Sequence, residues 1–167
     1  MTILKILTIP DQSLKSISND IDSHEITNEW HKTFYANMIE TATANDLVGL
    51  AANQVGVMQR VFIVDLNAID HPTEEKIEKN FQVFINSKII DLSYSIEYRL
   101  EGCASIPNVL GKVSRSTGAR LSWIDIDGQS HNDLFMNFTA RIIQHESDHL
   151  DGILLTDRTK MIRQIKK

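Results

Sequence analysis

An apolar residue recurs at every fourth position from about residue 26 to residue 44. These residues are Ile26, Trp30, Phe34, Met38 and Ala42. A spacing of four places their side chains along one face of an α-helix, so the segment is predicted to be an amphipathic helix with one buried stripe. Asn45 and Asp46 are expected to end this helix.

Runs rich in β-branched and aromatic residues predict strands after this helix. The predicted strands cover about residues 61–66, 81–85, 89–92, 95–100, 112–115 and 120–126. The last two are expected to form a hairpin joined by Ser116-Thr117-Gly118, and Asp127-Gly128 marks another turn. Residues 67–80 are polar and acidic, which predicts a solvated loop or a short surface helix.

A second helix is predicted from near Asn137, a suitable N-cap, to Asp151-Gly152, where glycine can adopt the left-handed conformation. Strands separated from two flanking helices indicate an α+β fold, with antiparallel or mixed sheets wrapped around this second helix. An N-terminal helix and a short C-terminal helix complete the expected architecture. No internal repeat or low-complexity segment divides the sequence, so one domain over residues 1–167 is predicted.

Composition supports a single globular domain. The 167 residues are 42% hydrophobic, which is enough for a core that needs no disulfide. The net charge of -5 excludes a general basic field for nucleic acid or anionic membranes. A local exception is the C-terminal stretch with the basic residues Arg158, Lys160, Arg163, Lys166 and Lys167. Such a tail is usually only solvated, and contact with an acidic partner such as RNA is the alternative.

Cysteine content and hydropathy together suggest a cytoplasmic location. Cys103 is the single cysteine, which excludes an intramolecular disulfide and fits a reducing compartment. No apolar run approaches the roughly 18 residues of a membrane span. The N-terminus also lacks the apolar region and cleavage site of a signal peptide.

The candidate chemistry begins with His145-Glu146-Ser147-Asp148-His149. Histidines four residues apart lie on one helix face, about a turn apart, so both rings can bind one metal ion. Glu146 would then face the open side of the ion, where water can be deprotonated. A zinc peptidase, a structural metal site and a solvated helix face are all compatible with this pentapeptide.

A third ligand is needed for a catalytic metal site, which keeps one position open. Cys103 can supply it, because it follows a strand-like run in Glu101-Gly102-Cys103-Ala104-Ser105. As a lone cysteine it can equally be an inert core residue. The remaining histidines lie in segments with a surface-like pattern and are expected to be ordinary. They are His24, His31, His71 and His131.

The segment from Val48 to Gly56 is small and apolar except for Asn53 and Gln54. Taken alone, it is best interpreted as close packing between a helix and a strand. The alternative is that it presents backbone groups to an extended ligand, with Gln54 donating to a developing oxyanion.

Three blocks resemble the peptide deformylase family, whose members remove the formyl group from the N-terminal formyl-methionine of nascent chains. The family patterns are G-x-G-L-A-A-x-Q, E-G-C-x-S and Q-H-E-x-D-H-L-x-G. The chain has Gly49-Leu50-Ala51-Ala52-Asn53-Gln54, then Glu101-Gly102-Cys103-Ala104-Ser105, then Gln144-His145-Glu146-Ser147-Asp148-His149-Leu150-Asp151-Gly152. The blocks occur in the family's order, and the similarity extends over nearly the whole chain.

The resemblance implies a site of one divalent ion held by Cys103, His145 and His149. The ion would be Fe²⁺ in the native form, with Zn²⁺, Ni²⁺ or Co²⁺ as replacements, since thiolate and imidazole ligands suit several of these metals. Glu146 would take a proton from the attacking water and pass it to the departing amine. Gln54 and the backbone N–H of Ala104 would stabilise the oxyanion. The products would be formate and a peptide with a free amino terminus.

The same resemblance implies how substrate binds. The main chain of an extended formyl-methionyl peptide would pair along Val48, Gly49 and Leu50. The methionine side chain would enter an apolar pocket walled by Val48, Phe138, Ile142 and the His145 ring. Neither DNA nor a membrane is expected as a partner.

Several positions depart from the family pattern. Leu47 replaces the first glycine of the G-x-G-L block, where it could narrow the cleft, change the backbone or pack harmlessly. Retained but altered activity is predicted. Ala104 stands where leucine is usual, and Asn108 where many members have glycine. The chain ends 15 residues after Gly152. It is therefore expected to lack the long C-terminal helix linked to ribosome docking in many bacterial members, so that docking would rest on the basic tail.

Two other functions remain compatible with the sequence. One is a related metallo-amidase whose substrate choice is altered by Leu47. The other is a degenerate binder of formyl-peptides or ribosomes, although the presence of all three ligands, Gln54 and Glu146 argues against it. A structural metal domain would need a fourth protein ligand, for which the sequence has no obvious candidate.

Overall fold

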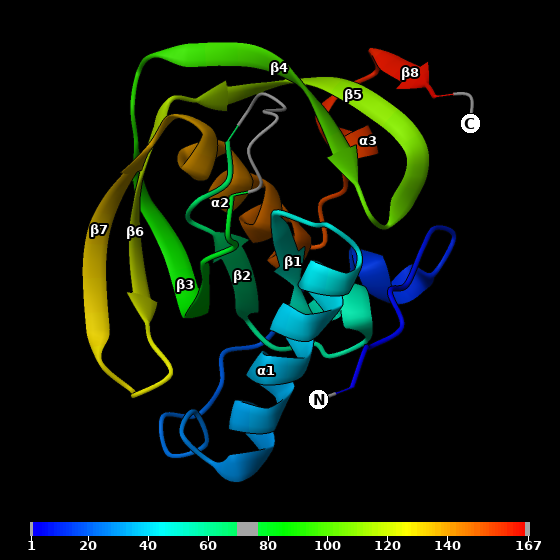
Figure 1. Cartoon of the computed structure of the whole chain (residues 1–167). Coiled ribbons are helices and arrows are strands. Elements are labelled where there is room, and N and C mark those ends of the chain that lie inside the picture. Colours follow the sequence, from blue (N-terminus) through cyan, green and yellow to red (C-terminus); the bar gives the residue numbers. More distant parts are fainter. Residues whose placement is uncertain (1, 70–76, 166–167) are drawn as a thin grey trace.

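The computed structural model describes residues 2–69 and 77–165 (Figure 1). Over these residues the strands form two sheets in which neighbouring strands pair antiparallel. The first sheet has the order β1-β2-β3-β6-β7. Its strands are β1 (Gly49–Ala51), β2 (Val61–Asp65), β3 (Phe81–Leu92), β6 (Gly118–Ile124) and β7 (Ser130–Met136). The second has the order β4-β5-β8, with β4 (Ile96–Cys103), β5 (Ile106–Ser116) and β8 (Ile162–Gln164).

The helices are α1 (Glu29–Ala44), α2 (Asn137–Leu150) and α3 (Leu155–Arg158), and two 3₁₀ helices are η1 (Gln12–Lys15) and η2 (Ala52–Val55). Helix α2 runs through the middle of the molecule, with the first sheet on one side and the second arching over it (Figure 1). The predicted α+β fold with a central histidine-bearing helix and a short C-terminal helix is confirmed. No helix in the described residues is long and apolar enough to cross a membrane.

Helix α1 differs from its prediction at its beginning. It starts after Asn28, whose side chain accepts a hydrogen bond from the His31 N–H and caps the helix. Ile26 is buried but precedes the helix, and Trp30 is 55% exposed. The buried stripe of the helix is therefore shorter than the one predicted from the spacing of four residues.

Helix α2 ends as predicted, with Gly152 at a φ of 69°. Its first residue is Asn137, so the N-cap is Met136, which makes no side-chain capping bond. The prediction of Asn137 as the N-cap was wrong, because its backbone takes a φ of 54° and its N–H donates to the Thr117 carbonyl at 2.7 Å.

The predicted strands differ from the observed ones where strands pair with partners distant in sequence. The predicted strands at 81–85 and 89–92 are one strand, β3, which is interrupted only by shifts of register. The predicted hairpin across Ser116-Thr117-Gly118 does not form, because β5 and β6 belong to different sheets. At this point the chain crosses between the sheets, and the Thr117 N–H donates to the Ser95 carbonyl at 2.9 Å. Strand β7 was not predicted.

Both faces of the first sheet are buried at β2. On β2, Val61 and Ile63 pack in a core with α1, whereas Phe62 and Val64 pack in a second core with α2. Period-two alternation sends successive side chains to opposite faces, so β2 is apolar throughout. The sheet therefore holds α2 between itself and the second sheet, which fixes the helix that carries both histidines.

Candidate metal centre and its pocket

Three side chains meet where β4 ends against α2. Cys103 lies at the end of β4, and His145 and His149 lie one turn apart on α2. One donor atom of each residue lies within 4.8 Å of the others. The Cys103 Sγ is 3.3 Å from the His149 Nε2. A thiolate with two imidazoles is a donor set for Zn²⁺ or a similar transition-metal ion, so these residues fit the implied metal.

Within the described residues, no fourth histidine, cysteine or carboxylate joins this group. Three protein ligands with an open position are characteristic of catalytic metal sites, whereas structural zinc sites use four. The arrangement thus disfavours a purely structural centre.

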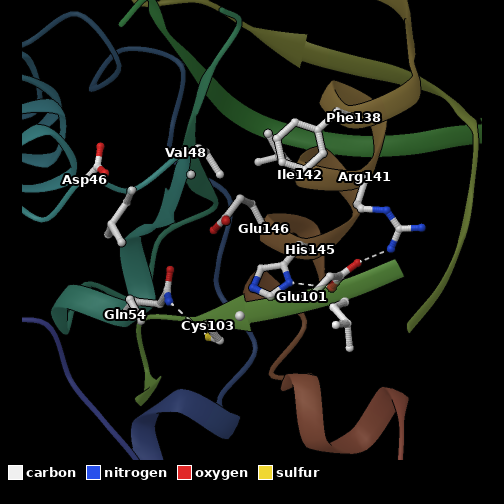
Figure 2. Close-up of a pocket in the computed structure, with 15 residues that line it drawn as sticks. Asp46, Val48, Gln54, Glu101, Cys103, Phe138, Arg141, Ile142, His145 and Glu146 are labelled. Atoms are coloured by element: carbon white, nitrogen blue, oxygen red, sulfur yellow. Dashed lines mark hydrogen bonds and ion pairs between the residues drawn. The ribbon is translucent and has the colours of Figure 1, made fainter. Parts of the chain in front are cut away.

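Cys103 reaches α2 because β4 is irregular at its end. Gly102 pairs with Leu110, but Cys103 pairs with Ile106, so the register shifts between the two residues. Such an irregularity redirects side chains at the end of a strand. Figure 2 shows Cys103 next to His145, with Gln54 on the other side.

Glu101 orients the first histidine. One of its oxygens lies 2.9 Å from the His145 Nδ1, which places the ring's Nδ1–H as a donor to Glu101. The Nε2 of His145 then remains for a metal ion. A carboxylate behind a ligand histidine also raises the ligand's basicity.

Two arginines compensate the buried charge of Glu101. Arg115 donates to both of its oxygens at 3.0 and 2.9 Å, and Arg141 donates to one at 2.6 Å. Burial opposes ionisation of Glu101, but hydrogen bonds from His145 and Arg115 outweigh it and hold the pKa well below its usual range. Arg115 also donates to Asp148 at 2.6 Å, which ties β5 to α2.

Sequence reasoning assigned no role to Glu101, although a signal was present. In a strand, residues two apart face the same side. Glu101 precedes Cys103 by two positions on β4, so this alternation would have placed its carboxylate on the side of the thiol.

Glu146 faces the pocket from α2 and is only 4% exposed. Burial raises its pKa to about 7. Its Oε2 has no hydrogen-bond partner in the described part of the chain. A Cβ on Gly49 would lie 2.5 Å from the Glu146 Oε1, so glycine is what allows this close approach. The carboxylate is therefore available to exchange a proton with a ligand in the pocket.

Gln54 is held by hydrogen bonds on both ends of its amide. Its Oε1 accepts from the Ala51 N–H at 2.8 Å, and its Nε2 donates to the Ser105 Oγ at 3.1 Å. The same Nε2 lies 3.8 Å from the Cys103 Sγ. The amide N–H₂ is thereby directed toward the metal-ligand group, as an oxyanion donor requires.

A pocket of about 380 Å³ opens beside these groups. Five of the six residues predicted to bind substrate line it, namely Val48, Gly49, Ala104, Phe138 and Ile142. Leu50 does not, because its side chain is fully buried in the core with α1. Only its backbone on β1, paired with Ile63, remains near the pocket wall. Leu100 and Arg141 are pocket residues that sequence reasoning missed.

Leu47 also lines the pocket and packs partly against the core with α1. Its carbonyl accepts a hydrogen bond from the Lys79 Nζ at 2.8 Å, and the same ammonium lies 2.9 Å from the Asp46 carboxylate. Asp46 adopts a φ of 52°. The backbone at the place of the family glycine is thus held in one position.

The other histidines of the described residues do not line the pocket. His31 is only 3% exposed, with ring nitrogens 3.0 Å from Asn28 and 3.2 Å from Gln59, so its predicted surface position was wrong. His24 is exposed, and His131 pairs with Asp125 at 2.7 Å. The prediction for His71 falls outside the described residues.

Known proteins resemble this chain over its whole length. A family model described as polypeptide deformylase matches residues 3–165. A peptide deformylase of Rickettsia canadensis is 34% identical over 100% of this chain and 97% of its own length. One of Novosphingobium aromaticivorans is 33% identical over 98% of this chain and 93% of its own length.

Solved structures show the same fold. The Met-Ala-Ser-bound class I type b peptide deformylase of Acinetobacter baumannii has a TM-score of 0.86 at 31% identity, covering 94% of this chain and 98% of that one. The peptide deformylase of Thermotoga maritima has a TM-score of 0.85 at 29% identity, covering 96% and 99%.

Proposed function

Because this chain belongs to the polypeptide deformylase family, we propose that Cys103, His145 and His149 hold its metal ion. The chain is a metal-dependent hydrolase that removes the formyl group from nascent peptides. The observation that best supports the residue assignment is the proximity of these three donors to one another, beside a pocket lined by Cys103, His145, Glu146 and Gln54.

We propose Fe²⁺ as the ion in the cell, with Zn²⁺, Ni²⁺ or Co²⁺ as replacements. The donor set of one thiolate and two imidazoles suits each of them, and the preference for iron rests on the family resemblance. When bound, such an ion supplies Lewis-acid chemistry, which polarises the formyl carbonyl and acidifies water.

Glu146 is assigned the proton transfers. Its buried carboxylate faces the pocket with one unpartnered oxygen, so it can take a proton from the attacking water. The protonated acid then delivers that proton to the departing amine. Formate and a free amino terminus result.

Gln54 and the backbone N–H of Ala104 are assigned the role of stabilising the negative charge that develops on the formyl oxygen. The Gln54 Nε2 is directed toward Cys103, and Ala104 follows Cys103 on the pocket wall. An amide N–H₂ and a backbone N–H that are already oriented need no reorganisation during the reaction, which is why such donors lower the barrier.

The peptide is proposed to lie extended between the first sheet and β4. Val48 and Gly49 bound one side of the pocket, and Gly102 bounds the other. Phe138 and Ile142 form an apolar wall suited to the methionine side chain. The similar peptide deformylase of Acinetobacter baumannii was solved with Met-Ala-Ser bound, which supports a short peptide as the ligand.

Further proposals concern partners and location. A protein that acts on nascent peptides is proposed to work in the cytoplasm, with weak ribosome contact through the basic C-terminal tail. Arg163 is exposed on β8, whereas Arg158 is engaged by Asp148 at 2.9 Å and contributes less. Lys166 and Lys167 fall outside the described residues. Neither DNA nor a membrane is proposed as a partner.

Formate release from formyl-Met-Ala-Ser tests the assignment. The protein is prepared anaerobically and loaded with Fe²⁺, alongside a Glu146→Ala variant. We expect the variant to lose about 100-fold to 10,000-fold in kcat, the contribution of a general acid-base residue. Metal content is measured on both proteins, so that ligand loss is separated from loss of the base. Formate no higher for the parent than for the variant would favour a non-catalytic binder.

A further inference from the structure

A row of apolar side chains lies exposed on β4. Ile96 is 57% exposed, Tyr98 56% and Leu100 54%. They occupy alternate positions, so they share the outer face of the strand, whereas Glu101 points inward and is buried. We call Ile96, Tyr98 and Leu100 the apolar row. Its last member also lines the pocket, so the row is continuous with the candidate active site.

Strand β4 is an edge strand. In the order β4-β5-β8 it has one neighbour, and no other strand of the described residues pairs with its second edge. Strand β1 is likewise at the edge of the first sheet, and the pocket lies between the two. An unpaired edge presents N–H and C=O groups to which an extended peptide can bond.

The backbone groups at this open edge can be identified from the pairing of β5. The Lys112 N–H donates to Met161 at 3.0 Å, on the side of β5 facing β8. Bonding direction alternates along antiparallel strands, so even-numbered β5 residues bond toward β8. Their partners on β4 are Gly102, Leu100 and Tyr98. These three residues therefore direct their N–H and C=O groups toward the open edge.

The proposed function sets the register of a peptide at this edge. The formyl group lies beside Cys103, so the chain extends along β4 toward Tyr98, antiparallel to it. The methionine side chain points inward to Phe138 and Ile142, and alternation then turns the second, fourth and sixth side chains outward. At equal rise per residue, these positions lie opposite Gly102, Leu100 and Tyr98.

We propose that the apolar row selects apolar side chains at the fourth and sixth residues of the formylated chain, an inference that rests on the proposed function. Directly opposite side chains on one face of an antiparallel pair are in contact, and such pairs stabilise it. Gly102 has no side chain to contact the second residue of the peptide, so the row does not select the side chain at that position. Selection thus begins beyond the short peptides that occupy the pocket itself.

Isomeric heptapeptide amides test this register. They are formyl-Met-Ala-Ser-Leu-Ser-Ser-Ser, formyl-Met-Ala-Ser-Ser-Leu-Ser-Ser and formyl-Met-Ala-Ser-Ser-Ser-Leu-Ser, with leucine at the fourth, fifth or sixth position. With the Fe²⁺-loaded protein, we expect kcat/KM for leucine at four or six to exceed that for leucine at five by about two- to fivefold, the effect of one cross-strand contact.

One variant and one control distinguish the contact with the fourth residue of the peptide from the contact with the sixth. Tyr98→Ser should remove the advantage of leucine at six and keep that of leucine at four. The matched control is Leu134→Ser on β7, which removes an equally exposed leucine, 54% exposed, from a strand outside the pocket. It should keep both advantages. Ratios between peptides within one protein cancel any overall change in activity.

The possible failures are distinguishable. Equal kcat/KM for the three peptides, with formate released from each, would overturn the selectivity and leave the deformylase assignment intact. Absence of formate from every peptide would overturn the proposed function, and this inference with it. Sedimentation of the parent and Tyr98→Ser provides a further check, because a change in oligomeric state would identify the row as a contact between copies and overturn peptide selection.

Discussion

At the residue scale, Gly49 determines how closely Glu146 can approach β1. An added Cβ would lie 2.5 Å from the Glu146 Oε1 and 2.8 Å from the Ile142 Cγ2. Both side chains project from a helix that is packed on two sides, so neither can move away freely. The position of Glu146, whose carboxylate we propose to be catalytic, thus requires a glycine here, in addition to any main-chain contact with substrate.

Gly49→Ala should therefore displace Glu146. We expect kcat for formyl-Met-Ala-Ser to fall by about 100-fold, the cost of a misplaced catalytic group. Gly118→Ala is the matched control, because the only atom within 3 Å of its Cβ would be the Met136 Sδ at 2.9 Å, near the end of a flexible and half-exposed side chain. Steady-state kinetics on both variants measures the effect. Parent-like kcat in Gly49→Ala would contradict the inferred steric link.

Leu47 is the departure from the family pattern with the clearest structural consequence. Its side chain lines the pocket and its carbonyl is bound by Lys79. In Leu47→Gly, we expect kcat/KM for formyl-Met-Ala-Ser to fall by about two- to fivefold through KM, because glycine adds backbone freedom beside the substrate. Leu47→Ala separates this from loss of the side chain. Equal specificity constants for Leu47→Gly and the parent would show that the leucine is functionally neutral.

At the scale of elements, Glu101 joins β4, β5 and α2. Its carboxylate accepts from Arg115 on β5 and from Arg141 and His145 on α2. Removing one partner of a buried ion pair leaves the opposite charge uncompensated, which is more costly than the pair itself is stabilising. The same carboxylate therefore serves both the packing of three elements and the orientation of His145, a proposed metal ligand.

Glu101→Gln should lower the free energy of unfolding by about 3 kcal/mol. It should also weaken metal binding by about 10- to 100-fold, because His145 loses its carboxylate partner. Urea titration and a competition assay with a chelator measure the two effects. Glu97→Gln is a matched control on the same strand, since Glu97 forms a partly exposed pair with Arg99 at 2.7 Å. Such a pair contributes at most about 1 kcal/mol. Similar losses in both variants would contradict the role of Glu101.

At the scale of the whole molecule, the proposed metal ligands come from two layers. Cys103 belongs to the second sheet, whereas both histidines belong to α2, which packs on the first sheet. A cation held by all three would therefore link elements that otherwise meet through side-chain packing, hydrogen bonds between Gln144 and Ser116, and the ion pairs Arg141–Glu101 and Arg115–Asp148. Binding to the folded state alone stabilises it by mass action.

Metal loading should raise the melting temperature. At a free metal concentration of about 100 Kd, the stabilisation is about 2.7 kcal/mol. Calorimetry with Co²⁺ or Zn²⁺, before and after chelation, measures the shift without relying on activity. Cys103→Ser, which removes one ligand with little change in volume, should lose most of the shift. A shift in Cys103→Ser equal to that of the parent would exclude Cys103 as a ligand.

Much of the site could be predicted from sequence because its chemistry is local. The histidine spacing needs only a helix to bring both rings to one face, and Glu146 lies between them. Gly152 ends that helix by adopting a φ of 69°, which glycine permits. Residue types and short-range periodicity were therefore sufficient to predict α2 and the two histidines proposed as ligands. The motif resemblance was needed to add Cys103 and Gln54 to the predicted site.

Only the tertiary structure decided which strands pair and which side chains are buried. Local periodicity cannot tell that β5 and β6 separate into two sheets, because strand partners are set by long-range packing. For the same reason Leu50 turned into the core and His31 became buried. The roles of Glu101 and of the open β4 edge also depend on which elements lie beside them. The sequence by itself thus determined the reactive groups, and the fold decided their partners and the surface that leads to them.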